Sequence, residues 1–214
     1  MSGYVPFNEH RHRAHAKLLA AVGRENRVLD VGCSSGYLAA PLAARRNTIV
    51  GLELDAAAAR DAQAFCEQVL VGDVETMDLP LEPGSFDVVL LGDVIEHLRD
   101  PVDTLRRLRR FLRPGGRLVL STPNVANWAI RLSLLGGRWR YTDRGILDRT
   151  HTHLFTRATL RETIENAGYV VDRIDFSAPV PGDSDLLDGA ARVVARLRPT
   201  LFAYQWVAVS HTGS

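Results

Sequence analysis

The segment Gly92–His97, GDVIEH, holds two carboxylates and an imidazole in close succession. Asp93, Glu96 and His97 are spaced so that one helical turn can bring their side chains together. Such a group can hold a divalent metal such as Mg²⁺, Mn²⁺ or Zn²⁺. Alternatively, His97 can take a proton from a hydroxyl nucleophile without a metal. A purely structural role is the third interpretation, and the sequence leaves all three open.

A second pair of histidines lies in the segment Asp148–His153, DRTHTH. His151 could join the first group as a further metal ligand, and His153 could serve in place of His97 as the general base. We therefore expect the catalytic residues His97, Asp93 and His153. The expected ligands of a divalent metal, Mg²⁺ or Mn²⁺ above all, are Asp93, Glu96, His97 and His151.

The segment Arg27–Glu53 has the pattern of a nucleoside-binding unit: an apolar strand, a turn with Gly32 and Gly36, a helix, and a second strand that ends in an acidic residue. The turn lacks the G-x-G-x-x-G spacing with which a dinucleotide site holds pyrophosphate. Asp30, at the mouth of the turn, would repel pyrophosphate but suits an ammonium group. The segment therefore indicates S-adenosylmethionine rather than NAD, and a dehydrogenase is disfavoured.

The sequence DVGCSSG in this turn resembles motif I of the class I S-adenosylmethionine-dependent methyltransferases, an acidic residue followed by three alternating glycines. The resemblance covers most of the chain and departs from the motif at Ser34, which replaces the middle glycine. We expect the serine to fit if its φ stays negative. The resemblance implies that the turn contacts the methionine part of the cofactor, Glu53 the ribose, and Asp73 and Val74 the adenine. The implied cofactor residues are Asp30, Gly32, Cys33, Ser34, Gly36, Glu53, Leu54, Asp73, Val74 and Gly92.

Two further stretches resemble particular members of that family. The pattern D-x-x-E-H at Asp93–His97 is similar to one in quinone-biosynthesis O-methyltransferases and small-RNA 2′-O-methyltransferases, where acidic and histidine ligands hold a divalent metal. The pattern W-x-Y-x-x-x-G-I-L-D-x-T-H, starting at Trp139, resembles bacterial methyltransferases associated with glycan or secondary-metabolite pathways.

Apolar runs alternate with helical patterns along the whole chain, which predicts a doubly wound α/β sheet. The resemblance implies seven strands, mostly parallel, with an antiparallel last strand. We expect strands near 28–31, 48–54, 68–71, 86–91, 117–121, 169–176 and 202–210, and helices near 56–66, 101–112, 157–167 and 190–197. The chain of 1–214 would be one domain, with residues 1–22 as an N-terminal cap helix. Tyr4 and Arg13 are candidates there for the cofactor carboxylate.

The segment 125–156 begins as a helix and then loses periodicity, which is typical of a functional insertion, and we interpret it as a substrate lid. Its arginines, with Trp139 and Tyr141, would suit a sugar or a sugar-linked metabolite. Trp128 and Trp139 could equally be core residues. The arginines between 99 and 113 are interpreted as a solvated helix face.

The bulk composition narrows the class of protein. A length of 214 residues favours one substantial core, and a net charge of +1 gives no strong attraction to nucleic acid. We find no apolar run of membrane-spanning length and no signal-peptide pattern, so the expected location is the cytoplasm. Cys33 and Cys66 are too few for a disulfide framework.

These observations predict a methyltransferase that acts on a small molecule, most simply at a hydroxyl in glycan or secondary-metabolite biosynthesis. N-methylation of a small amine and 2′-O-methylation of RNA are the alternatives. A non-catalytic scaffold is disfavoured, because a dead site has no need for Asp30, Glu53 and Asp73 together. A homodimer remains open.

Overall fold

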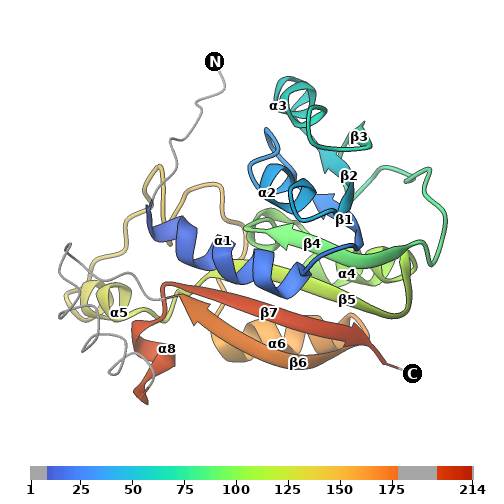
Figure 1. The fold of residues 1–214 in the computed structure, drawn as a ribbon. Helices are drawn as coiled ribbons and strands as arrows, with labels where there is room; N and C mark the ends of the chain where they lie inside the picture. Colours follow the sequence, from blue (N-terminus) through green and yellow to red (C-terminus); the bar gives the residue numbers. More distant parts are fainter. Residues whose placement is uncertain (1–8, 178–196, 214) are drawn as a thin grey trace.

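A computed structural model of the chain describes residues 9–177 and 197–213. It contains a seven-stranded sheet in the order β3-β2-β1-β4-β5-β7-β6 (Figure 1). The strands are β1 (Arg27–Val31), β2 (Thr48–Glu53), β3 (Gln68–Val71), β4 (Phe86–Gly92), β5 (Leu112–Pro123), β6 (Tyr169–Ser177) and β7 (Gln205–Thr212). The helices are α1 (Glu9–Val22), α2 (Ala39–Ala43), α3 (Ala56–Ala62), the short 3₁₀ helix η1 (Ile95–His97), α4 (Pro101–Arg109), α5 (Trp128–Leu135), α6 (Arg157–Asn166) and α8 (Pro199–Phe202).

Strands β1 to β5 are parallel, and β7 runs antiparallel to both of its neighbours, β5 and β6. The predicted doubly wound, mostly parallel sheet with an antiparallel last strand is confirmed. The carboxyl ends of β1 to β5 therefore meet at one edge, where ligands of open α/β sheets bind. Among the described residues, no helix is long and apolar enough to cross a membrane.

Helices cover both faces of the sheet, as Figure 1 shows. On one face α1 buries Ala14, Leu18 and Val22 against the central strands, together with Leu42 of α2. On the other face α4 and α6 bury apolar side chains such as Leu105 and Ile164 in a larger cluster. Central strands that are apolar on both faces, such as β4, are what this two-sided burial requires.

Three helices begin at residues whose side chains cap the first helical turn. The Asp55 carboxylate accepts hydrogen bonds from two backbone N–H groups at the start of α3. Asp100 caps α4, whose first residue is Pro101. Thr156 forms a capping box with Thr159 at the start of α6. Side chains of this kind satisfy the free N–H groups of a first helical turn.

Four predicted boundaries differ from the structure, and the first is the end of α4 at Arg109 instead of near residue 112. Helix α3 ends at Ala62 instead of continuing to Cys66. Strand β5 already pairs with β4 at Leu112, so Pro114-Gly115-Gly116 forms an irregularity within the strand and not a turn before it. The last strand begins at Gln205, because α8 occupies the positions before it. The predicted helix near 190–197 lies almost wholly outside the described residues.

Candidate functional site

The acidic residues predicted from the sequence follow neighbouring strands at the carboxyl edge of the sheet. Asp30 is in β1 and pairs with Gly51 of β2 and Leu90 of β4. Glu53 ends β2, beside Val71 at the end of β3. Asp73 lies two residues after the end of β3, and Asp93 follows directly after β4. The strand order β3-β2-β1-β4 therefore places these carboxylates along one continuous edge.

Two glycines of the turn after β1 stand where no side chain fits. Gly32 has φ +70°, and a Cβ there would lie 2.5 Å from a methyl group of Val94. Gly36 has φ +84°, and a Cβ there would lie 2.7 Å from the Phe65 ring. Both positions therefore need glycine for conformation and for space. The backbone of the turn is held to β2 by hydrogen bonds from the N–H groups of Gly32 and Cys33 to the Leu52 carbonyl.

Ser34 corrects one expectation. Its φ is +49°, in the left-handed region, so the condition that its φ stay negative is wrong. Its N–H donates a 2.8 Å hydrogen bond to Oε2 of Glu53, which fixes the strained turn against the end of β2. The serine thus adopts a conformation suited to the glycine that the family motif has at this position, and the strain is held by an acceptor on a neighbouring strand.

Replacing Ser34 with glycine should stabilise the protein by about 1 kcal/mol, because the left-handed conformation costs a residue with a Cβ about that much. Urea unfolding of the two proteins measures the difference. Ser34 contributes only its backbone N–H to the hydrogen bond with Glu53, so the affinity for S-adenosylhomocysteine should stay within a factor of two or so. A destabilised Ser34→Gly protein would show that the hydroxyl, and not the backbone, holds the turn.

Asp30 is a buried carboxylate at the mouth of this turn. Its side chain is 1% exposed, and its Oδ2 has no hydrogen-bond partner among the described residues. Burial, reinforced by the nearby Glu53 carboxylate, raises the pKa of Asp30 from 3.8 to about 7. A buried carboxylate without a partner is costly unless a cation or donor arrives. Asp30 therefore fits a ligand that brings an ammonium group.

The far side of the turn has the surfaces that a nucleoside needs. Leu54, beside Glu53, is 71% exposed, which is unusual for leucine and suits an aromatic ring laid against it. Asp73 uses Oδ1 to accept from the Glu75 N–H, and Val74 packs partly against the core. Gly92 has no room for a Cβ, which would lie 2.7 Å from Leu38.

Cys33 faces the other way from these groups. Its sulfur lies 2.7 Å from the place that a Cβ on Gly51 would occupy, so the thiol fills the space above that glycine. Burial, together with Asp30, raises the pKa of the Cys33 thiol well above its usual range. Its thiol is therefore neutral and structural, and only its backbone belongs to the turn.

A second group of polar side chains gathers beside η1. Glu96, His97 and His151 each offer one ligand atom, and these atoms all lie within 4.8 Å of one another. The two imidazole rings meet edge to face at 4.9 Å, and Glu96 is 1% exposed. His151 comes from the lid segment, which is held here by Thr152: its N–H donates to the Glu96 carbonyl and its hydroxyl to the Leu98 carbonyl.

The hydrogen bonds of the two histidines determine which nitrogen is free. Nδ1 of His97 lies 3.1 Å from the Thr150 carbonyl, and Nδ1 of His151 lies 3.0 Å from the Ile146 carbonyl. Because a carbonyl only accepts, each Nδ1 carries the proton and each Nε2 keeps a lone pair. Burial lowers the pKa of His151, which favours the neutral form of its ring. This arrangement is typical of histidines that ligate a metal.

Asp93 is not part of this cluster, although the sequence suggested that one helical turn would bring it there. Its φ is +56°, and its carboxylate accepts from the Ser121 hydroxyl at 2.8 Å and from Nε2 of Gln205 at 2.8 and 2.9 Å. Asp93 is thereby fixed by β5 and β7. The sequence analysis missed Ser121 and Gln205. The signal that could have identified them is a polar residue near the carboxyl end of an apolar strand, for Ser121, and at the start of another apolar strand, for Gln205.

His153 also lies apart from the cluster. Its Nε2 is 3.1 Å from the Arg99 carbonyl, and its ring stacks on Phe155. Since the carbonyl accepts, Nε2 carries the proton, and the ring helps to hold the lid segment to the loop before α4.

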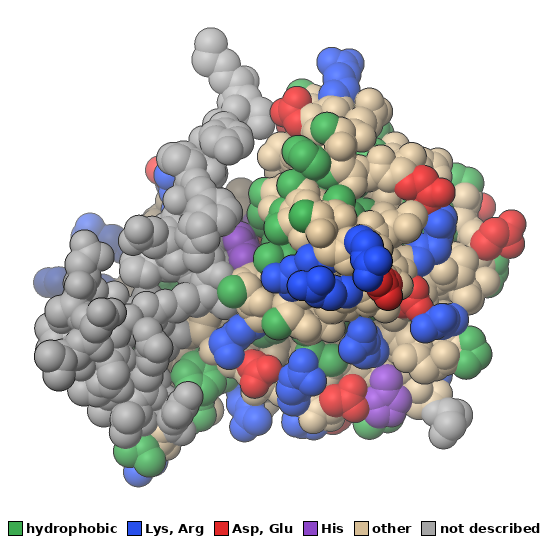
Figure 2. All heavy atoms as spheres, viewed as in Figure 1, with side chains coloured by type: hydrophobic (Ala, Val, Ile, Leu, Met, Phe, Trp, Pro, Cys, Tyr) green, Lys and Arg blue, Asp and Glu red, His purple; other side chains and the backbone are tan. Residues whose placement is uncertain are grey.

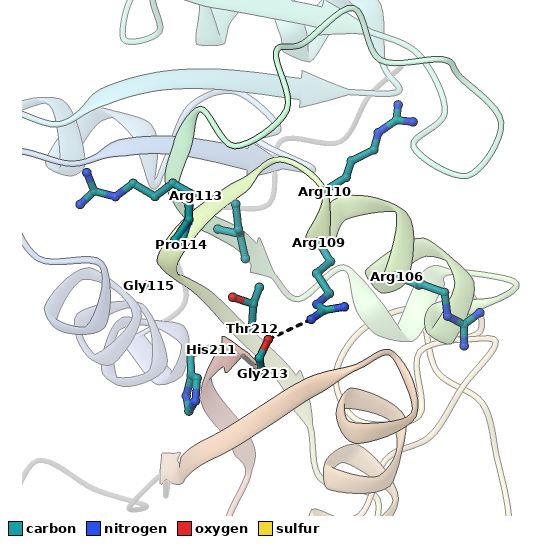
Figure 3. A pocket seen from close by; sticks show the side chains of 10 residues that line it. Arg106, Arg109, Arg110, Arg113, Pro114, Gly115, His211, Thr212 and Gly213 are labelled. Carbon is teal, nitrogen blue, oxygen red and sulfur yellow. Dashed lines mark hydrogen bonds between the residues drawn. The ribbon is translucent and has the colours of Figure 1, made fainter.

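A cavity of about 700 Å³ opens at the opposite, amino edge of the sheet (Figure 3). Figure 3 shows Arg110 and Arg113 pointing away from each other, and they pair with Asp78 and Asp87. Arg109 donates to the Gly213 carbonyl. None of the predicted site residues lines this cavity. Its lining is Arg106, Arg109, Arg110, Leu112, Arg113, Pro114, Gly115, His211, Thr212 and Gly213.

Known proteins with similar sequences are methyltransferases. Residues 7–174 match the methyltransferase domain family. The chain is 34% identical, over 76% of its length, to a probable S-adenosylmethionine-dependent methyltransferase of Mycolicibacterium smegmatis, of which it covers 59%. It is 29% identical, over 66% of its length, to the ubiquinone biosynthesis O-methyltransferase of Acinetobacter baylyi, of which it covers 62%. The chain thus spans about six tenths of the length of these curated relatives.

Among solved structures, the fold is similar to that of a methyltransferase complex from Haloferax volcanii, which contains the Trm112 activator. The TM-score is 0.67 at 24% identity, over 96% of this chain and 92% of the other. The family match covers most of the chain, and the sheet order and glycine turn agree with it. The chain therefore belongs to the class I S-adenosylmethionine-dependent methyltransferases.

Proposed function

We propose that the protein transfers the methyl group of S-adenosylmethionine to a hydroxyl of a small molecule. The observation that carries the proposal is the buried Asp30 Oδ2 beside the glycine turn, which has no hydrogen-bond partner in the described parts of the chain and fits the ammonium group of this cofactor. Glu53 and Leu54 at the next strand end fit a ribose and an adenine ring. One relative whose name specifies O-methylation favours oxygen as the acceptor atom.

S-adenosylmethionine supplies a methyl group already activated for displacement, so the protein must mainly align the acceptor and exclude water. We assign the alignment to the edge between the turn and η1. Glu96, His97 and His151 would hold a divalent metal, which lowers the pKa of a bound hydroxyl. Without a metal, the free Nε2 of His97 or His151 is the group able to take the hydroxyl proton. Asp93, held by Ser121 and Gln205, would orient the acceptor.

The acceptor class proposed is a sugar or sugar-linked metabolite, since Trp139 and Tyr141 in the lid segment lie exposed among arginines. An amine acceptor is the second candidate within the enzyme class. It needs no strong base, so Asp93→Ala, Glu96→Ala and His97→Ala proteins would keep their activity. RNA is disfavoured because basic and acidic side chains are interspersed on the face in Figure 2.

Calorimetric titration with S-adenosylhomocysteine, with NAD as the control ligand, tests the cofactor assignment. Micromolar binding of the first and no binding of the second is the expected result. Binding of NAD alone, by a protein shown to be folded, would return the site to the dinucleotide class that Asp30 disfavours.

The affinity for S-adenosylhomocysteine should rise with pH up to about pH 7. The pKa of Asp30 is about 7 in the free protein, so below that pH the carboxyl is protonated and cannot pair with the ammonium group. Binding then has to release a proton, and we expect roughly tenfold weaker binding near pH 6 than near pH 7.5.

Calorimetry in buffers of different ionisation enthalpy counts the released proton. An Asp30→Asn protein should bind weakly at every pH in this window and release no proton. A pH-independent affinity in the natural protein would mean that Asp30 does not meet the ammonium group.

A further inference from the structure

Helix α5 is apolar over most of its surface, yet none of its residues is buried. Leu132 is 57% exposed and Leu135 is 84% exposed, and Trp128 at the start of the helix is 46% exposed. A helix with apolar side chains all round is ordinarily found in the interior of a protein or in contact with lipid. The apolar surface of α5 therefore requires a partner.

The chain after α5 extends the same surface. Trp139 and Tyr141 are 39% and 52% exposed, and their rings meet edge to face at 6.1 Å. Two hydrogen bonds between Ser133 and Arg138 fix this stretch to the end of the helix. Trp128 and Trp139, which the sequence left open as core residues, are therefore surface residues. Tryptophan and tyrosine are the aromatic types enriched where a protein meets the head-group region of a bilayer.

The same segment carries an excess of positive charge. Residues 128–149 contain five arginines and two aspartates, a net charge of +3, whereas the whole chain has +1. One of the aspartates, Asp143, pairs with Arg149 at 2.7 Å. Within the described parts of the chain, Arg138, Arg140 and Arg144 are exposed and have no carboxylate partner. The positive charge thus lies in the same stretch of chain as the exposed apolar side chains.

We infer that this surface, the α5 patch, binds the face of a lipid bilayer that contains anionic head groups. The patch consists of Trp128, Leu132, Leu135, Trp139 and Tyr141, rimmed by Arg131, Arg138, Arg140 and Arg144. Its apolar side chains enter the boundary between head groups and acyl chains, and its arginines pair with phosphates. A second copy of the chain is a poorer partner, because it would bring two segments of charge +3 together.

Because α5 follows β5, the patch lies beyond the carboxyl edge of the sheet, on the side of the predicted cofactor site (Figure 1). A protein bound through the patch would turn that edge towards the bilayer. The inference does not depend on methyl transfer, since it needs only the exposed side chains and their charge. It competes with the acceptor class proposed above, because both use Trp139 and Tyr141.

Co-sedimentation with vesicles tests the inference. The full chain should sediment with phosphatidylcholine vesicles that contain phosphatidylglycerol, and at least about tenfold less well with phosphatidylcholine alone, because anionic lipid attracts each basic side chain near the surface. Binding should also shift the tryptophan emission to the blue, since Trp128 and Trp139 are exposed and Trp206 is already buried.

Two double variants separate the two contributions. Leu132→Gln with Leu135→Gln removes apolar surface and keeps good helix formers, and Arg138→Gln with Arg140→Gln removes charge. Each should weaken binding to anionic vesicles on the order of tenfold or more. The matched controls are Val170→Gln, an exposed apolar residue of β6, and Arg24→Gln with Arg60→Gln, exposed arginines elsewhere. The controls should bind like the natural protein, and circular dichroism checks that every variant is folded.

Three results would overturn the inference. The first is no sedimentation with either vesicle. The second is binding that both double variants leave unchanged, which would place the lipid contact elsewhere. The third is a natural protein that is dimeric by light scattering and becomes monomeric in the Leu132→Gln, Leu135→Gln variant without binding lipid, which would make a second copy the partner.

Discussion

Replacing Glu53 with alanine should weaken the binding of S-adenosylhomocysteine by about a hundredfold or more. A carboxylate that accepts from two ribose hydroxyls makes two charge-assisted hydrogen bonds, each contributing about 1.5–3 kcal/mol. Glu53 also accepts from the Ser34 N–H, which holds the strained turn, so its loss loosens the methionine end of the site as well. Calorimetric titration gives the change in the dissociation constant.

The neighbouring Asp55 provides the control, because it is a carboxylate two residues from Glu53 that serves as the N-cap of α3. Asp55→Ala should cost about 1 kcal/mol of stability and leave the affinity for the ligand within a few-fold. Equal losses of affinity in the two variants would mean that ligand binding depends on the conformation at the end of β2, and that Glu53 does not hold the ribose.

The second large effect is expected on metal binding. If Glu96, His97 and His151 are ligands, the protein should bind Mn²⁺, and His151→Ala should weaken that binding by about a hundredfold or more, since removing even an outer partner of a metal ligand costs 10–100-fold. The paramagnetic resonance of free Mn²⁺ measures the bound fraction directly, without a methyl acceptor. Glu96→Gln should have a similar effect.

Two nearby residues distinguish the ligand set that the structure brings together from the ligand set that the sequence pattern predicts. Asp93, a predicted ligand, turns to Ser121 and Gln205, and His153 turns to Arg99. Asp93→Asn and His153→Ala proteins should therefore bind Mn²⁺ like the natural protein. A loss in Asp93→Asn equal to that in His151→Ala would restore the pattern-based ligand set. The absence of any Mn²⁺ binding would leave His97 and His151 as metal-free bases.

Local signals in the sequence were sufficient to predict the elements of the parallel part of the sheet. The apolar run of β4, the caps Asp55 and Thr156, and Pro101 at a helix start each act within a few residues, so their effects can be predicted without the rest of the chain. The start of β5 could not be predicted in this way. Its first residue, Leu112, pairs with Phe86 of β4, and that pairing overrides the turn signal of Pro114-Gly115-Gly116.

The site shows the same limit at longer range. Spacing placed Glu96 and His97 together, but the partners that fix Asp93 are Ser121 and Gln205, the second of them 112 positions away in the chain. His151 reaches His97 only because Thr152 is bound to the carbonyls of Glu96 and Leu98. Contacts of this kind depend on the antiparallel insertion of β7 and on the path of the lid segment, for which one sequence carries no periodic signal.

The lid segment is also closed at its base. Asn124 forms an isolated β-bridge with Phe155. Inside the loop that this bridge closes, Thr142 forms a second β-bridge with Asp148. A loop whose two ends are already joined adds little strain to the sheet when its length or composition changes. The residues between Asn127 and Asp148 can therefore be replaced together by another sequence, while His151 and Thr152 keep their contacts with η1. In evolution, and in engineering, a change confined to these residues could alter the acceptor while the residues of the proposed cofactor site stay the same.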